Sequence, residues 1–222
     1  MARRRPAFGM ASLVASMGAG ADADELTTRV LDAAAVLLTD YGLRRWSMDD
    51  VADRAGVGRT SLYRKFAGRD ELVYAVLARE VRAAFAAITE AAAHFESLED
   101  KVVEGALVAL ALVEDSLVAR LIQSDPATFL PFLTTEAGPL VALARELLVS
   151  QAVALGAEVD REEAAELSEL AARLGLSFIL TRATVFPTDD QAAARRTLQR
   201  VLGPILAPLA APPGRRRESL PV

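Results

Sequence analysis

Apolar residues recur at intervals of three and four along most of the chain, and no stretch shows the strict alternation of an amphipathic strand. Over residues 24–41 they form one stripe that includes Leu26, Val30 and Leu37 and ends before Gly42. Glycine often follows the last helical residue because it adopts positive φ without strain. The pattern predicts a helix over 24–41 and, because similar stripes continue toward the C-terminus, an all-α fold.

Two short helices are predicted next, joined by a tight turn. Ser47 is a favourable N-cap for a helix over 48–55, and acidic residues occupy the first turn, where the helix dipole favours negative charge. Gly56 closes this helix and permits the positive φ that the turn requires. The second short helix begins two residues later, directs Leu62 inward and is expected to end at Gly68. Two helices joined in this way form a helix-turn-helix.

The rest of the chain divides into further helices at capping and breaking residues. Ser97 and either Asp115 or Ser116 are candidate N-caps, and the proline after residue 125 is a break. The last helix is expected to kink or end early at the prolines that follow residue 203. These signals predict helices over residues 69–95, 98–114, 116–124, 136–155 and 160–186, and one that begins near 190.

Charge is unevenly distributed along the chain. The 222 residues are 52% hydrophobic and carry a net charge of -5, so the chain can bury a core and is acidic overall. Residues 44–69 nevertheless hold seven basic and three acidic residues, whereas residues 81–211 hold ten basic and eighteen acidic ones. A basic run is usually only a solvated face, so the side chains between the charges must decide whether it binds nucleic acid.

Catalytic and metal-binding chemistry has few candidates. The chain has no cysteine and one histidine, His94, which removes most metal sites and most histidine-dependent catalytic schemes, and no Ser-His-acid set is recognisable. No phosphate-binding glycine loop is present. We therefore expect no enzymatic activity, no metal and no other cofactor. The uncharged stretch 6–21 has 16 residues, fewer than the roughly 20 that a membrane helix needs, so we expect a cytoplasmic protein without a membrane span.

The outward face of the second short helix carries hydrogen-bond donors suited to phosphate oxygens and base edges. A helical hairpin with a polar exterior would explain the apolar positions, but it would not explain so many basic and hydroxyl groups in so short a helix. The segment from Ser47 to Leu72, with its Val-Ala pair, Ala-Gly-Val turn and Leu-Tyr-x-x-Phe helix, resembles the DNA-binding signature of the TetR family of transcriptional regulators. Two positions depart from that signature: Gly58 stands where the family often has serine, and Arg69 where it usually has lysine.

The resemblance implies a role for each polar residue of this segment. Ser47, Tyr63 and Lys65 would contact phosphates, and Arg69 would bind a phosphate at the start of the following helix. The residues that would face base edges are Arg59, Thr60 and Ser61, and Arg64 could serve in either role.

The resemblance also implies a domain organisation. Residues 22–68 would form a three-helix DNA-binding domain, and residues 69–211 a helical effector-binding and dimerisation domain. The flanking segments 1–21, a basic arm with Met10 or Met17 as alternative starts, and 212–222 are expected to be disordered. The last two long helices have wide apolar faces, which suit a homodimer interface or, alternatively, intrachain core.

A mostly apolar effector pocket is expected among the middle helices, which implies a small hydrophobic ligand. The function expected is that of a repressor released from a palindromic operator in double-stranded DNA by this ligand. A helical carrier of hydrophobic ligands, with an incidental helix-turn-helix, is the alternative. The apolar candidates for the pocket lining are more often plain core than pocket wall, and the two arginines could bind a ligand head group or simply face water. The candidates are Phe85, Ile88, Leu110, Arg120, Leu121, Phe129, Phe132, Phe178 and Arg182.

Overall fold

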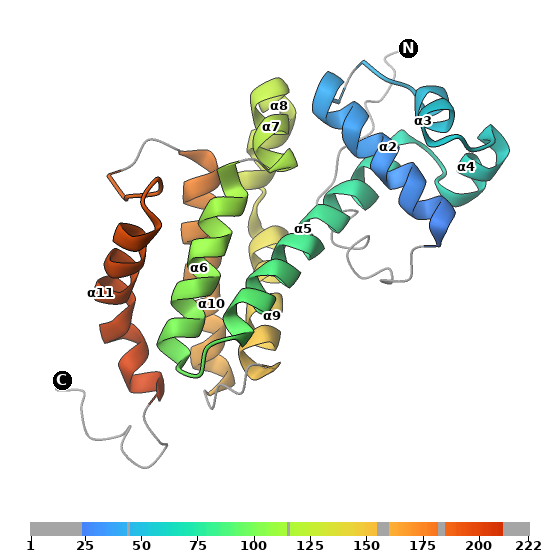
Figure 1. Ribbon diagram of the computed structural model, residues 1–222. Coiled ribbons are helices and arrows are strands. Elements are labelled where there is room, and N and C mark those ends of the chain that lie inside the picture. The colour runs from blue at the N-terminus through green and yellow to red at the C-terminus, as the bar shows by residue number, and fades with distance from the viewer. Residues whose placement is uncertain (1–23, 44, 115, 155–159, 182–184, 211–222) are drawn as a thin grey trace. The chain divides into compact units, whose positions relative to one another are not determined.

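The computed structural model describes residues 24–43, 45–114, 116–154, 160–181 and 185–210 (Figure 1). All regular structure within these ranges is helical, which confirms the predicted all-α fold. The predicted arm and tail lie outside the described residues. The helices are α2 (Glu25–Tyr41), α3 (Met48–Ala55), α4 (Arg59–Lys65), α5 (Arg69–Ala93), α6 (Leu98–Glu114), α7 (Leu117–Ser124), α8 (Pro126–Leu133), α9 (Gly138–Ala154), α10 (Arg161–Leu180) and α11 (Gln191–Ala210).

The predicted capping residues begin several of these helices. The Ser47 hydroxyl accepts a hydrogen bond from the Asp50 N–H, and the Asp50 carboxylate accepts one from the Ser47 N–H, so α3 opens with a reciprocal capping box. This contact holds the pKa of Asp50 below its usual value. Ser116, rather than Asp115, caps α7, because its hydroxyl accepts a hydrogen bond from Ala119.

Some boundaries differ from the prediction. The short helix α8 follows the expected break at residue 125, because proline is tolerated at the first helical position. Helix α10 ends at Leu180, six residues early, and Phe186 then stacks edge-on against Phe178. Helix α11 continues through Pro204 and Pro208, so the expected early end was wrong. A proline inside a helix removes its own N–H bond and crowds the carbonyl four residues earlier, and we attribute the tolerance of both prolines to the packing of this helix against α6.

The chain forms two compact units that divide it differently from the expected boundary at residue 68. The described residues up to Ala83, together with those from 116 to Leu140, form the first unit. The second unit contains the described residues of Ala84–Glu114 and those from Val141 onward. Each unit is therefore built from two separate stretches, and α5 contributes to both.

The first unit has a continuous hydrophobic core centred on α2. Val30 and Leu38 of this helix are completely or almost completely buried. They belong to the same cluster as Leu121 of α7 and Phe129 of α8, which are also buried. The helices α7 and α8 therefore complete the core of the helix-turn-helix unit, and this explains why the unit extends beyond residue 68.

The second unit is arranged around α6, which packs along α11 and also contacts α10 (Figure 1). Val103 and Leu107 of α6 are buried against Ala194 of α11. The buried Glu104 forms an ion pair with Arg195 on the same pair of helices, and the opposite charge offsets part of the cost of burying the carboxylate.

Candidate nucleic-acid interface

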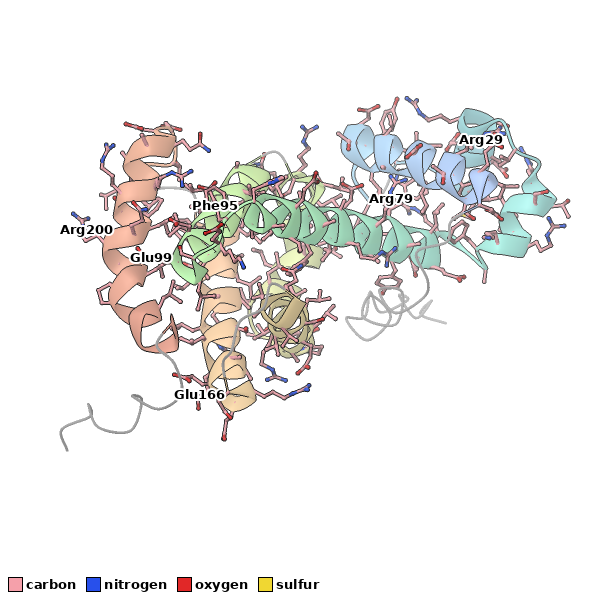
Figure 2. The ribbon with its side chains drawn as sticks, turned by 60° about the horizontal axis from the view of Figure 1, so that its bottom comes forward. Arg29, Arg79, Phe95, Glu99, Glu166 and Arg200 are labelled. Carbon is pink, nitrogen blue, oxygen red and sulfur yellow. The ribbon has the colours of Figure 1, made fainter. Side chains whose placement is uncertain are left out.

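The turn between α3 and α4 has the geometry that its glycine predicts. Gly56 adopts a left-handed conformation with φ 62° and ψ 40°. The Arg29 guanidinium on α2 donates hydrogen bonds to the carbonyls of Ala55, at 3.1 and 2.5 Å, and of Gly56, at 2.7 Å (Figure 2). These bonds satisfy carbonyls that the end of α3 leaves without helical partners. The sequence analysis missed Arg29, because a contact across 26 residues leaves no local signal.

Helix α4 is anchored by one buried residue and leaves its polar residues accessible. Leu62 is completely buried in the core of the first unit. Thr60 and Arg64 are exposed, Tyr63 is half exposed, and Ser61 is partly buried. The predicted donor side chains thus lie on the accessible surface of a helix whose position is fixed by packing.

Two of the predicted DNA-contacting cations are held by carboxylates within the first unit. Arg59 Nη1 lies 3.0 Å from Asp49 Oδ2, and Lys65 Nζ lies 3.1 Å from Asp24 Oδ2. Asp24 is also the N-cap of α2, where it accepts hydrogen bonds from the hydroxyl and N–H of Thr27. These bonds, with a smaller effect of Lys65, lower the pKa of Asp24 to about 2. The carboxylates fix the orientation of both cations and would compete with DNA phosphates for them.

Arg69, the predicted phosphate-binding residue, stacks on the only tryptophan of the chain. Its Cζ lies 4.4 Å from the ring centroid of Trp46, within the range of a cation–π contact. Burial lowers the pKa of Arg69, and the Asp70 carboxylate partly opposes that shift. Trp46 was missed in the sequence analysis, although its position next to the Ser47 cap and the basic segment is visible there.

The candidate effector residues are divided between the two units. Leu121 and Phe129 are buried in the first unit, and Arg120 lines a hollow of about 220 Å³ there, together with Glu80. A second hollow in that unit has about 330 Å³ and is lined mainly by α2 and α3. Phe85, Ile88, Leu110 and Phe178 lie in the second unit and are partly buried. The side chain of Phe132 and all of Arg182 lie outside the described part of the chain.

The predicted dimerisation helices expose large apolar side chains. Leu170 and Leu174 of α10 are 52% and 51% exposed, and Val201 of α11 is 54% exposed. Other members of the predicted apolar faces serve the intrachain core, since Leu198 packs on the α6 cluster and Phe178 stacks on Phe186. The intrachain-core interpretation therefore holds for Leu198 and Phe178, whereas Leu170, Leu174 and Val201 stay about half exposed in the protomer.

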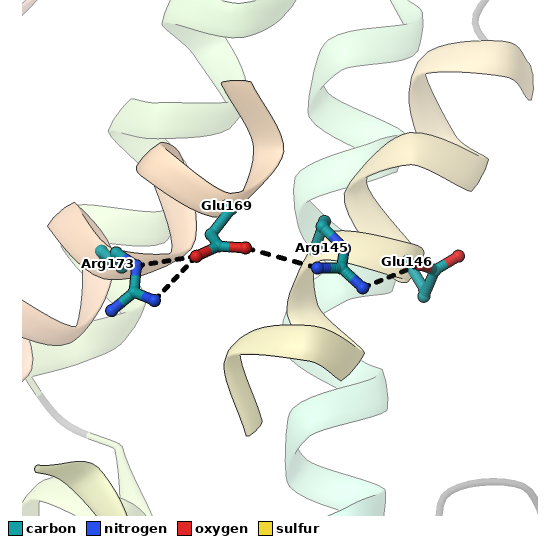
Figure 3. Close-up of polar contacts among 4 residues, drawn as sticks. All are labelled: Arg145, Glu146, Glu169 and Arg173. Atoms are coloured by element: carbon teal, nitrogen blue, oxygen red, sulfur yellow. Dashed lines mark hydrogen bonds and ion pairs between the residues drawn. The ribbon is translucent and has the colours of Figure 1, made fainter. Parts of the chain in front are cut away.

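A polar network joins α9 and α10 (Figure 3). The Glu169 carboxylate accepts hydrogen bonds from Arg173 at 3.0 and 2.7 Å and from Arg145 of α9 at 3.3 Å. These contacts, chiefly that with Arg173, lower the pKa of Glu169. Figure 2 shows that Glu166 and Arg200 point away from α10 and α11.

Comparison with known proteins identifies the family. A sequence model of bacterial regulatory proteins of the tetR family matches residues 30–76. A second model, of the bacterial tetracycline repressor C-terminal domain, matches residues 81–204, which is more than half of the chain. The chain belongs to the TetR family. As a member of that family it is a transcriptional regulator with a DNA-binding helix-turn-helix, and it is not an enzyme.

Similar proteins agree with this assignment. The HTH-type transcriptional activator FasR of Mycolicibacterium smegmatis is 43% identical over 58 residues, about a quarter of the length of either protein. The structure of AlkX, a TetR family repressor from Dietzia sp. implicated in biodegradation of n-alkanes, superimposes with a TM-score of 0.66 at 26% identity and covers 82% of this chain and 98% of AlkX. SCO7518 of Streptomyces coelicolor A3(2), at 23% identity and a TM-score of 0.53 over 80% of this chain and 98% of its own, shares the fold.

Two features, a metal-binding cluster and a membrane-spanning helix, are absent from the described residues. They contain no cluster of three or more histidine, cysteine or acidic side chains able to hold a metal ion. None of the helices described is long and apolar enough to cross a membrane.

Proposed function

We propose that this TetR-family protein is a dimeric repressor that binds a palindromic operator and is released from it by a small hydrophobic effector. The observation that carries the proposal is the accessible donor face of α4, held in place by the buried Leu62. Similarity to the repressor AlkX supports repression rather than activation, because that structural similarity extends over most of this chain. The similarity to the activator FasR is limited to 58 residues.

In the proposed complex α4 of each protomer enters one major groove. Arg59, Thr60 and Ser61 near its N-terminus face base edges, and Tyr63 and Lys65 face phosphates. Lys65 must exchange Asp24 for a phosphate, and it can do so at low cost because an exposed ion pair contributes little stability. Arg64 serves either role. Ser47 contacts a phosphate only through a hydroxyl that also caps α3.

The exposed apolar residues of α10 and α11 form the proposed homodimer interface. Leu170, Leu174 and Val201 expose half of their surface in the protomer, and burial against a second copy removes that area from water. A two-fold dimer also presents two copies of α4, as a palindromic operator requires.

The proposed effector acts through α5, the helix that belongs to both units. Arg69 stands at its first position, and Phe85 and Ile88 lie farther along it in the second unit. An apolar ligand bound beside these residues would shift α5 and change the spacing of the two α4 helices in the dimer. Coupling between two sites is typically about 1–3 kcal/mol and is reciprocal, so operator DNA must weaken effector binding by the same factor.

Two experiments test this function. An electrophoretic mobility shift with DNA from upstream of the encoding gene should show salt-dependent binding to a palindrome, and a reporter under that DNA should be repressed by the protein. Binding to no fragment would refute the DNA-binding role, and increased reporter output would show an activator. Long-chain acyl thioesters and n-alkanes, titrated with and without operator, test the effector, since equal ligand affinity in both states excludes release by that ligand.

A further inference from the structure

Trp46 is held in one orientation by its own hydrogen bond. Its side chain is only 6% exposed, and its indole N–H donates to the Gly42 carbonyl at 2.8 Å. Gly42 itself terminates α2, where its N–H donates to Leu38. The aromatic ring is therefore fixed to the end of α2, in the core of the first unit.

The position of Arg69 against this ring buries N–H donors that find no hydrogen-bond partner within the described residues. Its Nε and Nη2 are buried and have no hydrogen-bond partner in the described ranges, although the residue as a whole is only partly buried. The N–H groups of an arginine in contact with solvent form hydrogen bonds to water. Burial without a partner loses those bonds and is therefore unfavourable. The stack on Trp46 compensates in part for this lost hydration.

A purely structural role for Arg69 explains this arrangement poorly. A neutral aliphatic side chain could cover the ring without burying unpartnered donors. An arginine held rigidly at the start of α5 is instead a preorganised donor, because the rotamer entropy of its long side chain is already lost before an anion arrives. The proposed DNA-binding function supplies that anion as a backbone phosphate next to α4.

We infer that Trp46 is a positioning residue for DNA binding, whose indole face holds the Arg69 guanidinium in the orientation that meets a backbone phosphate. This inference rests on the proposed function. It assigns a role in operator affinity to a residue that is too buried to contact DNA extensively itself. It also makes the only tryptophan of the chain a reporter of whether that phosphate contact is occupied.

A double-mutant cycle tests the inference with the full-length protein and an operator fragment, at several salt concentrations. Arg69→Ala should reduce the slope of log affinity against log salt by about one, because one phosphate contact is lost. Trp46→Leu should reduce the slope in the same direction and weaken binding roughly two- to thirtyfold. In the Arg69→Ala background Trp46→Leu should have little further effect, and Trp46→Phe should restore part of the affinity in the wild-type background.

Two controls separate positioning from folding. Arg79→Ala removes a positive charge that pairs with Asp32 in the same unit, and it should leave the salt slope unchanged. Thermal unfolding shows whether Trp46→Leu still folds; if it does not, Trp46→Phe and Trp46→Tyr replace it in the cycle. Operator should change the tryptophan fluorescence of the wild-type protein, and this change should be much smaller in Arg69→Ala.

Three results would overturn the inference. The first is an equal loss of operator affinity from the tryptophan substitution in the wild-type and Arg69→Ala backgrounds. The second is a salt slope that the tryptophan substitution leaves unchanged. The third is an operator-induced fluorescence change that persists in Arg69→Ala. Each would leave DNA binding by the wild-type protein intact and would assign Trp46 to the core alone. A wild-type protein that binds no operator fragment would instead refute the proposed function itself.

Discussion

Leu174→Ala should weaken the proposed dimer by one to two orders of magnitude. The side chain is 51% exposed in the protomer, one helical turn from the equally exposed Leu170. Complete burial of a leucine side chain contributes about 1.5–3 kcal/mol, so burial of the remaining half contributes about 0.8–1.5 kcal/mol. A two-fold dimer loses the side chain from both protomers, which gives about 1.5–3 kcal/mol, or roughly 10- to 150-fold in the dissociation constant.

Sedimentation equilibrium over a range of protein concentrations measures this constant directly. Val153→Ala is the matched control, because Val153 of α9 is an apolar side chain that is 65% exposed but lies outside the proposed interface. Val153→Ala should leave the dissociation constant of the dimer unchanged. The monomers of both variants should have the same melting temperature as the wild-type monomer. The interface would be placed wrongly if Leu174→Ala dimerised like the wild type, or if Val153→Ala weakened the dimer as much.

Three other substitutions test the DNA-binding unit. Gly56→Ala should lower the free energy of unfolding by about 1–2 kcal/mol in denaturant titrations, because its positive φ is strained for alanine and the new Cβ would lie 3.0 Å from Arg29; unchanged stability would contradict the turn geometry. Asp24→Asn should destabilise the protein at neutral pH. A folded-state pKa of about 2, below the usual 3.8, means that the ionised carboxylate stabilises above pH 4, so the difference from wild type should shrink as pH falls from 4 to 2; a constant difference would exclude this origin. Asp49→Asn should tighten binding to nonspecific DNA, since it frees Arg59 and removes a negative charge near phosphates, and unchanged or weaker binding in a filter assay would count against competition by that carboxylate.

The helix-turn-helix could be predicted closely because its signals are local. The Ser47 cap, the Gly56 turn and the inward Leu62 each act within a few residues of their own position, and all three are found where expected. Local signals also predicted a cap for α7 at Asp115 or Ser116, and Ser116 is the N-cap.

Features that depend on tertiary contacts could not be predicted. Leu121 and Phe129 were expected either to line an effector pocket or to be plain core, and periodicity does not show which core an apolar side chain joins. The stack of Arg69 on Trp46 joins residues separated by a loop and two helices. Proline signals likewise predicted an early end to α11, where packing against α6 outweighs the local cost.

The assembly of the first unit from two separate stretches affects its biosynthesis. Residues up to 83 leave the ribosome before the stretch 84–114 of the second unit, and Phe129 follows later still. At synthesis rates of about 5–20 residues per second, the apolar surface of α2, which ends at Tyr41, waits roughly 4–18 s until Phe129 has been added. The nascent helix-turn-helix therefore cannot complete its hydrophobic core before the stretch 84–114 of the second unit has been translated, and a ribosome that stalls in between leaves an uncovered apolar face for chaperones and proteases to recognise.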